Sequence, residues 1–312
     1  MLSTTRIGVP YLRAVGCAYE ARLPWLSDQA GGDMSEASHA DRQGQREHYT
    51  PGYSEAIVRA MQRRTLASCA PFLLPHLHQG LRVLDCGCGA GAMTLELAER
   101  VTPGEVVGLD SEPRVLEQAR ELAATRGLGN VQFDQGDVYT LPYPDASFDA
   151  LFSHALISHL REPGRALAEM RRVLKPGGIA AVVENDPATF VVSPSGSEME
   201  RFVNLSVRRQ RYSGGLQLAS RHLRGALLET GFAVAEAHAG AEAWGTPERV
   251  RAVAEAFAAN MRSAEFVGTM LDQGWATQSE LDELDSGLLA WGERPDAFLA
   301  VLKCGALGWT SG

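Results

Sequence analysis

Basic side chains, cysteines and long apolar runs are all scarce in this chain of 312 residues. Lysine and arginine total 29 against 38 acidic residues, and the net charge of −9 argues against a nucleic-acid partner, which would favour a basic face. No apolar run approaches the roughly 20 residues that a membrane-spanning helix needs. The first 30 residues also lack the basic start and apolar core of a signal peptide. We therefore expect a cytoplasmic protein with no membrane span and no nucleic-acid partner.

The few cysteines are not spaced as metal ligands. Of the five, Cys86 and Cys88 are separated by one residue rather than by the two-residue gap of a zinc knuckle. No second pair or histidine is suitably placed, so we predict no metal site. Both thiols are expected to lie beside a ligand-binding loop as small side chains. The basic run at residues 208–211 is expected to be the solvated face of a helix.

A glycine-rich turn is the most informative feature that the chain does contain. Residues 81–91 read Leu-Arg-Val-Leu-Asp-Cys-Gly-Cys-Gly-Ala-Gly, and an amphipathic stretch follows at 92–101. The pattern predicts a short strand, a tight turn through alternating glycines, and a helix. Glycine adopts the φ values that a Cβ forbids, and its bare backbone lets a ligand approach the helix N-terminus. The turn therefore predicts a nucleotide-like cofactor.

The acidic residues near this turn indicate which cofactor is bound. Gly87, Gly89 and Ala92 also satisfy the dinucleotide fingerprint, so the glycines alone do not exclude a nicotinamide dehydrogenase. Asp85, however, would repel a pyrophosphate but could bind a cationic ligand. Asp110 ends the next predicted strand, where its carboxylate can accept both ribose hydroxyls. These acids favour a cationic nucleoside over NAD.

The turn resembles the first motif of the class I S-adenosylmethionine-dependent methyltransferases, acid-x-Gly-x-Gly-x-Gly. Three later stretches agree in order: 130–138 is similar to the third strand and the acidic turn that holds adenine, 141–150 to the run into strand four, and 174–178 to the turn into strand five. The resemblance covers about residues 47–240 and implies S-adenosylmethionine as cofactor. The residues that it implies for cofactor binding are Tyr49, Asp85, Gly87, Gly89, Asp110, Ser111, Gly136, Asp137, Val138 and Ser153.

Alternating strand and helix patterns predict an α/β fold. Near the end of the chain, strands are expected at 232–238 and 298–303. Before them, strands are expected near 81–85, 105–110, 130–134, 148–152 and 179–184, and helices near 92–101, 113–126 and 164–174. This order predicts a parallel sheet with helices on both faces. The resemblance implies a Rossmann-like sheet of seven mostly parallel strands with an antiparallel last strand, together with helical cap and lid insertions.

We expect a flexible N-terminal extension followed by one methyltransferase domain. The expected divisions are an extension at 1–46 and a domain at 47–312 that comprises a helical cap (47–80), a cofactor-binding core (81–186), a lid insertion (187–222) and C-terminal strands (223–312) with a helical insertion (247–292).

Methyl transfer places few demands on side chains, because positioning supplies much of the catalysis. The catalytic candidates follow the predicted fourth and fifth strands. His154 could act as a base or orient the acceptor, since the ordinary histidine pKa is about 6.5. Glu184 could hydrogen-bond an acceptor hydroxyl or amine. The competing interpretation of His154 is a packed histidine, and that of Glu184 is the polar start of a loop. His159 is a weaker catalytic candidate.

Within the family, the chain looks most like ubiquinone/menaquinone-type and natural-product methyltransferases. Aromatic residues and methionines at 199–212 and 257–275 favour an apolar acceptor pocket under a helical lid, although core packing explains each of them equally well. We expect a monomer or homodimer that methylates a small, partly hydrophobic metabolite at a hydroxyl oxygen in secondary metabolism. A quinone-type C-methyltransferase, an N-methyltransferase, and a cofactor-retaining cyclase or binding protein of the same fold remain open.

Overall fold

The computed structural model describes residues 55–212 and 219–312. The expected extension at 1–46 and Tyr49 lie outside the described residues. The strands are β1 (Arg82–Cys86), β2 (Glu105–Asp110), β3 (Val131–Gln135), β4 (Phe148–His154), β5 (Leu174–Ser193), β6 (Val234–Trp244) and β7 (Phe298–Trp309). The helices are α2 (Glu55–Gln62), α3 (Leu66–Cys69), η2 (Pro71–His76), α4 (Ala92–Val101), α5 (Pro113–Arg126), η3 (Ile157–His159), α6 (Pro163–Val173), α7 (Glu198–Tyr212), α8 (Ala219–Glu229), α9 (Pro247–Met261), α10 (Ala264–Asp272) and α11 (Gln278–Gly292).

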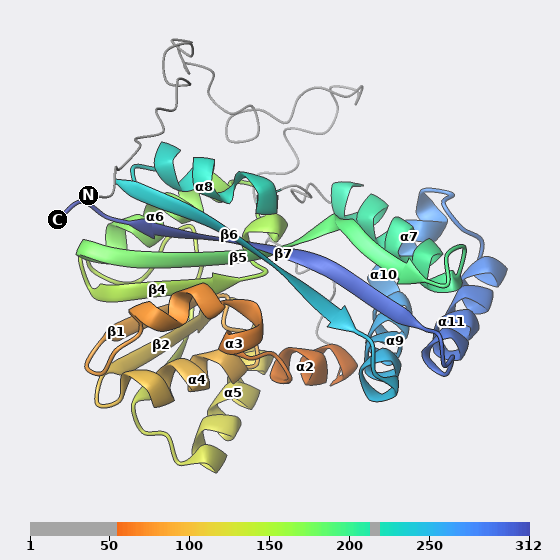
Figure 1. Cartoon of the computed structure of the whole chain (residues 1–312), viewed down its shortest axis with the longest axis horizontal. Coiled ribbons are helices and arrows are strands. Elements are labelled where there is room, and N and C mark those ends of the chain that lie inside the picture. The colour runs from red at the N-terminus through yellow and green to blue at the C-terminus, as the bar shows by residue number, and fades with distance from the viewer. Residues whose placement is uncertain (1–54, 213–218) are drawn as a thin grey trace, which may run out of the picture. The chain divides into compact units, whose positions relative to one another are not determined.

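The seven strands form one sheet in the order β3-β2-β1-β4-β5-β7-β6 (Figure 1). Strands β1 to β5 pair in parallel, and β7 runs antiparallel to both β5 and β6. The predicted α/β fold, a Rossmann-like sheet of mostly parallel strands with an antiparallel last strand, is confirmed. The carboxyl ends of the parallel strands, where ligands bind in such sheets, lie along one edge.

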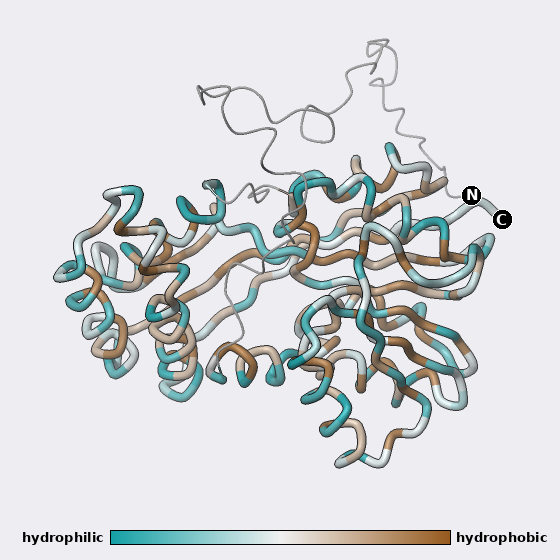
Figure 2. Tube along the Cα trace, turned by 180° about the vertical axis from the view of Figure 1, so that it is seen from behind, coloured by the Kyte–Doolittle hydropathy of each residue, from teal (hydrophilic) through white to brown (hydrophobic). Residues whose placement is uncertain are grey.

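Both faces of the sheet are covered by helices. Figure 1 shows α3, α4 and α5 on one face and α6 and α8 on the other. The central strands β1 and β4 are buried along almost their whole length, as expected where both faces of a parallel sheet are covered. Figure 2 shows the same strands as mainly hydrophobic. This buried sheet is the rigid base on which the loops at its carboxyl edge are held.

Local signals set the helix boundaries next to that edge. Gly91, with φ +79°, is the residue before α4, which begins at Ala92. Helix α5 has Pro113 in its first turn, where the missing N–H leaves no bond unmade. It ends at Gly127, whose φ of +67° lets its N–H reach carbonyls of the last turn. The predicted bounds of both helices are confirmed.

Strands β5, β6 and β7 continue well beyond the ends expected for them. The fifth strand was predicted to stop near residue 184, but β5 runs to Ser193 after a break in pairing between Asp186 and Val191. Its far end pairs with the start of β7, where Ser193 lies opposite Phe298. Pro187 falls within the break. A proline lacks a backbone N–H donor, so in a sequence it indicates the end of a strand. The first part of the expected lid insertion at 187–222 is therefore strand.

This extended ribbon carries a group of helices with its own core. Helices α7, α9, α10 and α11 lie at its far end in Figure 1, and their buried side chains form a separate apolar cluster with residues such as Phe266 and Trp291. The Trp291 indole Nε1–H donates to the Ser193 carbonyl at 2.9 Å, which ties α11 to β5. None of the helices in the described ranges is both long and apolar enough to cross a bilayer.

Candidate functional site

The glycine loop between β1 and α4 has the backbone that the sequence predicts. Gly87, Gly89 and Gly91 have φ values of +73°, +52° and +79°, a region that L-residues with a Cβ avoid. At Gly91 a Cβ would also lie 2.8 Å from the Cβ of Ala119, so no larger residue fits between α4 and α5. At Gly89 a Cβ would approach only the Met61 sulfur, at 3.5 Å. The outer side of the loop is thus bounded by α2.

Two buried carboxylates, those of Asp85 and Asp110, lie next to the glycine loop. The Asp85 Oδ2 accepts a hydrogen bond from the Thr94 hydroxyl at 2.7 Å, and burial raises the pKa of Asp85 to about 7. Asp110 accepts from the Gly89 N–H at 2.9 Å and from the Glu112 N–H at 3.0 Å. Burial also raises the pKa of Asp110. Asp85 faces the first turn of α4, whereas Asp110 lies against the glycine loop itself.

The acidic turn after β3 joins the same region. The Gly136 N–H donates to the Asp110 carbonyl at 3.1 Å, and a Cβ on Gly136 would lie 2.8 Å from a Leu109 methyl group. The Asp137 Oδ1 accepts from the Tyr139 N–H at 2.9 Å, which shapes the turn. The ends of β1, β2 and β3 are therefore joined by backbone hydrogen bonds.

The remaining expected cofactor residues lie around these turns. Val138 is buried, Ser111 is exposed, and Ser153 is fully buried at the end of β4. Within the described ranges the Ser153 Oγ has no hydrogen-bond partner. An open glycine cradle, a carboxylate at the next strand end and an acidic turn fit a nucleoside cofactor bound along this edge. Tyr49 lies outside the described residues.

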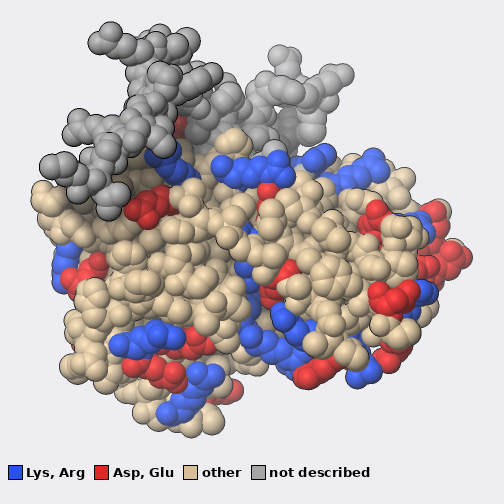
Figure 3. Space-filling view, viewed as in Figure 1, with Lys and Arg blue, Asp and Glu red and all other residues tan. Residues whose placement is uncertain are grey.

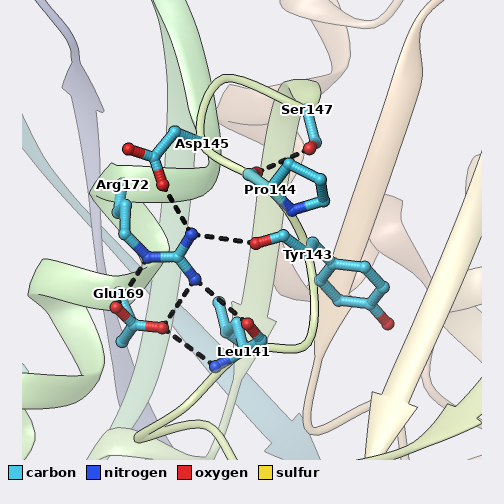
Figure 4. Close-up of polar contacts among 7 residues, drawn as sticks. All are labelled: Leu141, Tyr143, Pro144, Asp145, Ser147, Glu169 and Arg172. Carbon is cyan, nitrogen blue, oxygen red and sulfur yellow. Dashed lines mark hydrogen bonds and ion pairs between the residues drawn. The ribbon is translucent and has the colours of Figure 1, made fainter.

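An arginine that the sequence analysis missed holds the loop after the acidic turn (Figure 4). The Arg172 guanidinium, on α6, donates to the carbonyls of Leu141 at 3.0 Å and Tyr143 at 2.8 Å. It also forms ion pairs with Asp145 and Glu169, each at 2.7 Å. From the sequence, an arginine in the last turn of an amphipathic helix is expected to be exposed to solvent. The sequence analysis therefore missed it, because only the tertiary fold places a loop against it.

A cavity of about 660 Å³ adjoins the carboxyl ends of β4 and β5. This size is within the range of small-molecule sites. Its walls come from the turn between α2 and α3, from η3, and from α7 and α9. The polar lining at the strand ends consists of His154, Ser158, His159, Glu184 and Asn185. The apolar lining consists mainly of Phe190, Phe202, Val203, Trp244, Val253, Phe257, Phe266 and Val301.

Both predicted catalytic candidates face this cavity. His154 is 5% exposed, and neither ring nitrogen has a hydrogen-bond partner in the described part of the chain. Burial, together with the charges of Arg64 and Lys303, holds the pKa of His154 well below its usual value, so the imidazole is neutral. Next to it, Ala155 has a φ of +54°, an uncommon conformation that is enriched at functional sites.

Glu184 is almost completely buried, and its two carboxylate oxygens have different surroundings. Oε1 accepts from the backbone N–H groups of Leu156 at 2.9 Å and Ile157 at 2.7 Å. Oε2 is buried and has no partner among the residues described. Burial raises the pKa of Glu184 to about 7, although hydrogen bonds from Ser158 and the η3 backbone oppose the shift. This carboxyl group can therefore gain or lose a proton near neutral pH.

A buried lysine network beside the cavity was not anticipated. The Lys303 Nζ, on β7, lies 2.6 Å from the Glu242 carboxylate and 3.1 Å from the Cys69 sulfur. The Arg249 guanidinium approaches the other Glu242 oxygen at 3.6 Å. Sequence reasoning missed this network because it placed the end of the sixth strand near residue 238, short of Glu242. The lysine that ends the apolar run 298–302 was the sequence signal that could have indicated this buried network.

The cysteines of the glycine loop lie close to the expected cofactor region. Cys86 is buried and Cys88 is half-buried, and burial raises the pKa of both thiols well above the usual value. Over residues 55–212 and 219–312, no group of three or more histidine, cysteine, aspartate or glutamate side chains could hold a metal ion.

Comparisons with known proteins agree with this geometry. A family model described as a methyltransferase domain matches residues 77–210. The chain is 30% identical over 285 residues to a probable methyltransferase, ltbC, of Aspergillus luteorubrus, covering 85% of this chain and 98% of that protein. It is 42% identical over 110 residues to a demethylmenaquinone methyltransferase of Deinococcus radiodurans, covering 35% of this chain and 45% of that protein. A solved phosphoethanolamine N-methyltransferase of Haemonchus contortus, in complex with S-adenosylhomocysteine, shares the fold with a TM-score of 0.51 at 19% identity, covering 82% of this chain and 57% of that chain.

Proposed function

Since this chain belongs to the class I S-adenosylmethionine-dependent methyltransferases, we propose that it methylates a hydroxyl oxygen of a small, partly hydrophobic metabolite in secondary metabolism. The cavity beside β4 and β5 carries this proposal. Its lining combines an apolar surface, which α7 and α9 largely provide, with polar groups at the strand ends, on the α2–α3 turn and on the same two helices. A cavity of about 660 Å³ matches a small molecule rather than a polymer. The enzyme is proposed to be a cytoplasmic monomer or homodimer with no nucleic-acid partner.

The glycine edge of the sheet is proposed to hold the cofactor. We assign the ribose hydroxyls to Asp110, which lies against the glycine loop. The backbone of Gly87 and Gly89 would face the methionine portion, and Gly136, Asp137 and Val138 would surround the adenine. Asp85, Ser111, Ser153 and Tyr49 complete the proposed set. When bound, S-adenosylmethionine supplies an electrophilic methyl group, whose bond to sulfur breaks as the bond to the acceptor oxygen forms.

Glu184 and His154 are proposed to act on the acceptor hydroxyl. The unpartnered Oε2 of Glu184 accepts the hydroxyl proton, while Oε1 stays fixed by two backbone N–H groups. A pKa of about 7 places proton transfer near neutral pH, where general bases are most effective. His154 orients the hydroxyl through its neutral imidazole, because its lowered pKa makes it a weak base.

A quinone-type carbon methyltransferase is the second candidate function. It is favoured by the 42% identity to a demethylmenaquinone methyltransferase over 110 residues. Carbon methylation requires the same cavity and the same removal of a proton, so the two candidates differ in the acceptor rather than in the residues of the enzyme.

Product analysis tests the proposed function. The full chain is incubated with methyl-labelled S-adenosylmethionine and a fractionated extract of small metabolites, and the products are analysed by mass spectrometry and NMR. We expect one metabolite to gain a single labelled methyl group on oxygen. A labelled methyl on ring carbon would support the second candidate instead. Conversion of a metabolite without any gain of the label would contradict both and indicate a cyclase.

A further inference from the structure

We infer that the acceptor carries an anionic oxygen group, such as a carboxylate, that Arg64 and Arg209 bind within the same cavity. This inference rests on the proposed function of that cavity and adds the chemical class of its ligand. The acceptor would then have an apolar body, a methylated hydroxyl near His154 and Glu184, and an acidic group held by the two arginines.

The two arginines reach the cavity from different walls. Arg64 lies in the turn between α2 and α3 and is half-buried, whereas Arg209 lies on α7 and is only 3% exposed. Both guanidinium charges act on His159, whose pKa burial and these charges lower to about 4. Arg64, Arg209 and His159 all line this one cavity. Figure 3 shows basic side chains gathered on the face over α2.

Arg209 is held in an apolar setting and keeps its charge. Its Cζ lies 5.1 Å from the centroid of the Phe266 ring. Burial lowers the pKa of Arg209 to about 10, while the charge of Glu265 opposes the shift, so the guanidinium is protonated at neutral pH. Ser206 lies one turn earlier on the same helix and also lines the cavity. Its buried hydroxyl has no hydrogen-bond partner within the described ranges, which leaves a donor for an oxyanion.

The carboxylates of the cavity do not neutralise Arg64. Glu242 is engaged by Lys303 and Arg249, and the pKa of Glu184 is about 7, so Glu184 is only partly ionised at neutral pH. Glu248 and Glu255 are exposed on α9. Arg64 makes no ion pair with any residue that the structure describes. A guanidinium binds a planar oxyanion through two parallel hydrogen bonds, which makes a carboxylate a well-matched partner.

The apolar wall indicates the shape of the rest of the acceptor. The Phe202 ring lies 4.9 Å from that of Phe257 and 5.8 Å from that of Phe266, measured between centroids. These three rings form one aromatic surface on α7, α9 and α10, next to Arg209. Aromatic side chains favour stacked or edge-on contacts with flat rings. An aromatic or alicyclic acid satisfies both this surface and the arginines.

Paired probes of equal shape and different charge test this inference. Binding of 2-naphthoate and of its neutral counterpart 2-naphthamide to the full chain is measured by calorimetry with saturating S-adenosylhomocysteine. We expect the wild-type protein to bind 2-naphthoate at least about tenfold more tightly, as a charge-assisted hydrogen bond predicts. Arg64→Gln should reduce this preference severalfold, since Arg209 remains, and leave the affinity for S-adenosylhomocysteine unchanged. The control Arg251→Gln, which changes an exposed arginine that pairs with Glu293 and does not line the cavity, should retain it.

The outcomes separate this inference from the proposed function. Naphthoate that binds no more tightly than naphthamide, in a protein that binds S-adenosylhomocysteine, would overturn the anion site alone. A loss of S-adenosylhomocysteine affinity in Arg64→Gln with the naphthoate preference intact would assign Arg64 to the cofactor and also overturn it. A wild-type protein that fails to bind S-adenosylhomocysteine would instead refute the proposed function.

Discussion

At the scale of single residues, the environment of a side chain decides its chemistry more than its type does. His154 is the residue type usually chosen as a base, but burial and two nearby cations keep its pKa well below neutral. Glu184 has the opposite shift, because burial disfavours its charged form and raises its pKa to about 7. The sequence places both groups at the strand ends but cannot show which of them exchanges a proton near neutral pH.

We predict that Glu184 controls the pH dependence of turnover. Its carboxylate forms as the pH rises through about 7, so kcat of the wild-type enzyme should rise over that range. Glu184→Gln should remove the rise and lower kcat by about 100-fold or more, with little change in the KM for the cofactor. Rates measured from pH 5.5 to 9 test this. A Glu184→Gln enzyme that keeps the wild-type pH profile would exclude Glu184 as the base.

At the scale of elements, local signals fixed helix ends well and strand ends poorly. Gly91, Pro113 and Gly127 act within a few residues, and the helices they bound were predicted correctly. The extra length of β5, β6 and β7 depends on distant helices that pack on the ribbon, so strand patterns alone did not reveal it. Lys303 and Glu242 were missed for the same reason, since their proximity depends on how far these strands extend.

The loop after β3 provides a prediction at this scale. Arg172→Met leaves the carbonyls of Leu141 and Tyr143 without their donor and breaks two ion pairs. We expect the free energy of unfolding to fall by about 2 kcal/mol, and the affinity for S-adenosylhomocysteine to fall because the loop adjoins the acidic turn at Asp137. Denaturant unfolding and calorimetry measure the two effects.

The matched control for this prediction is Arg171→Met, which removes the same charge from an exposed neighbour on α6. It should leave both quantities nearly unchanged. Equal behaviour of the two variants would mean that the Arg172 network does not hold the loop.

At the scale of the whole molecule, the turns proposed to hold the cofactor were more predictable than the cavity proposed to hold the acceptor. The residues from Asp85 to Asp137 are close in sequence to the strands that position them, so motif spacing located them together. The cavity proposed to hold the acceptor combines residues from the α2–α3 turn, η3, α7 and α9, which are up to about 200 residues apart along the chain. Arg64 and Arg209 meet there only after folding, and no sequence pattern links them.

The central claim is that the glycine edge of the sheet holds S-adenosylmethionine and that Asp110 binds its ribose. Calorimetry of S-adenosylhomocysteine binding to the wild-type protein, to Asp110→Asn and to the control Glu117→Gln tests this claim most directly. Glu117 is an exposed carboxylate on α5, so its variant changes the charge equally. We predict binding by the wild type and the control, and at least about tenfold weaker binding by Asp110→Asn, since charge-assisted hydrogen bonds are lost. Unchanged affinity in Asp110→Asn, or binding of NAD with no response to S-adenosylhomocysteine, would contradict the claim.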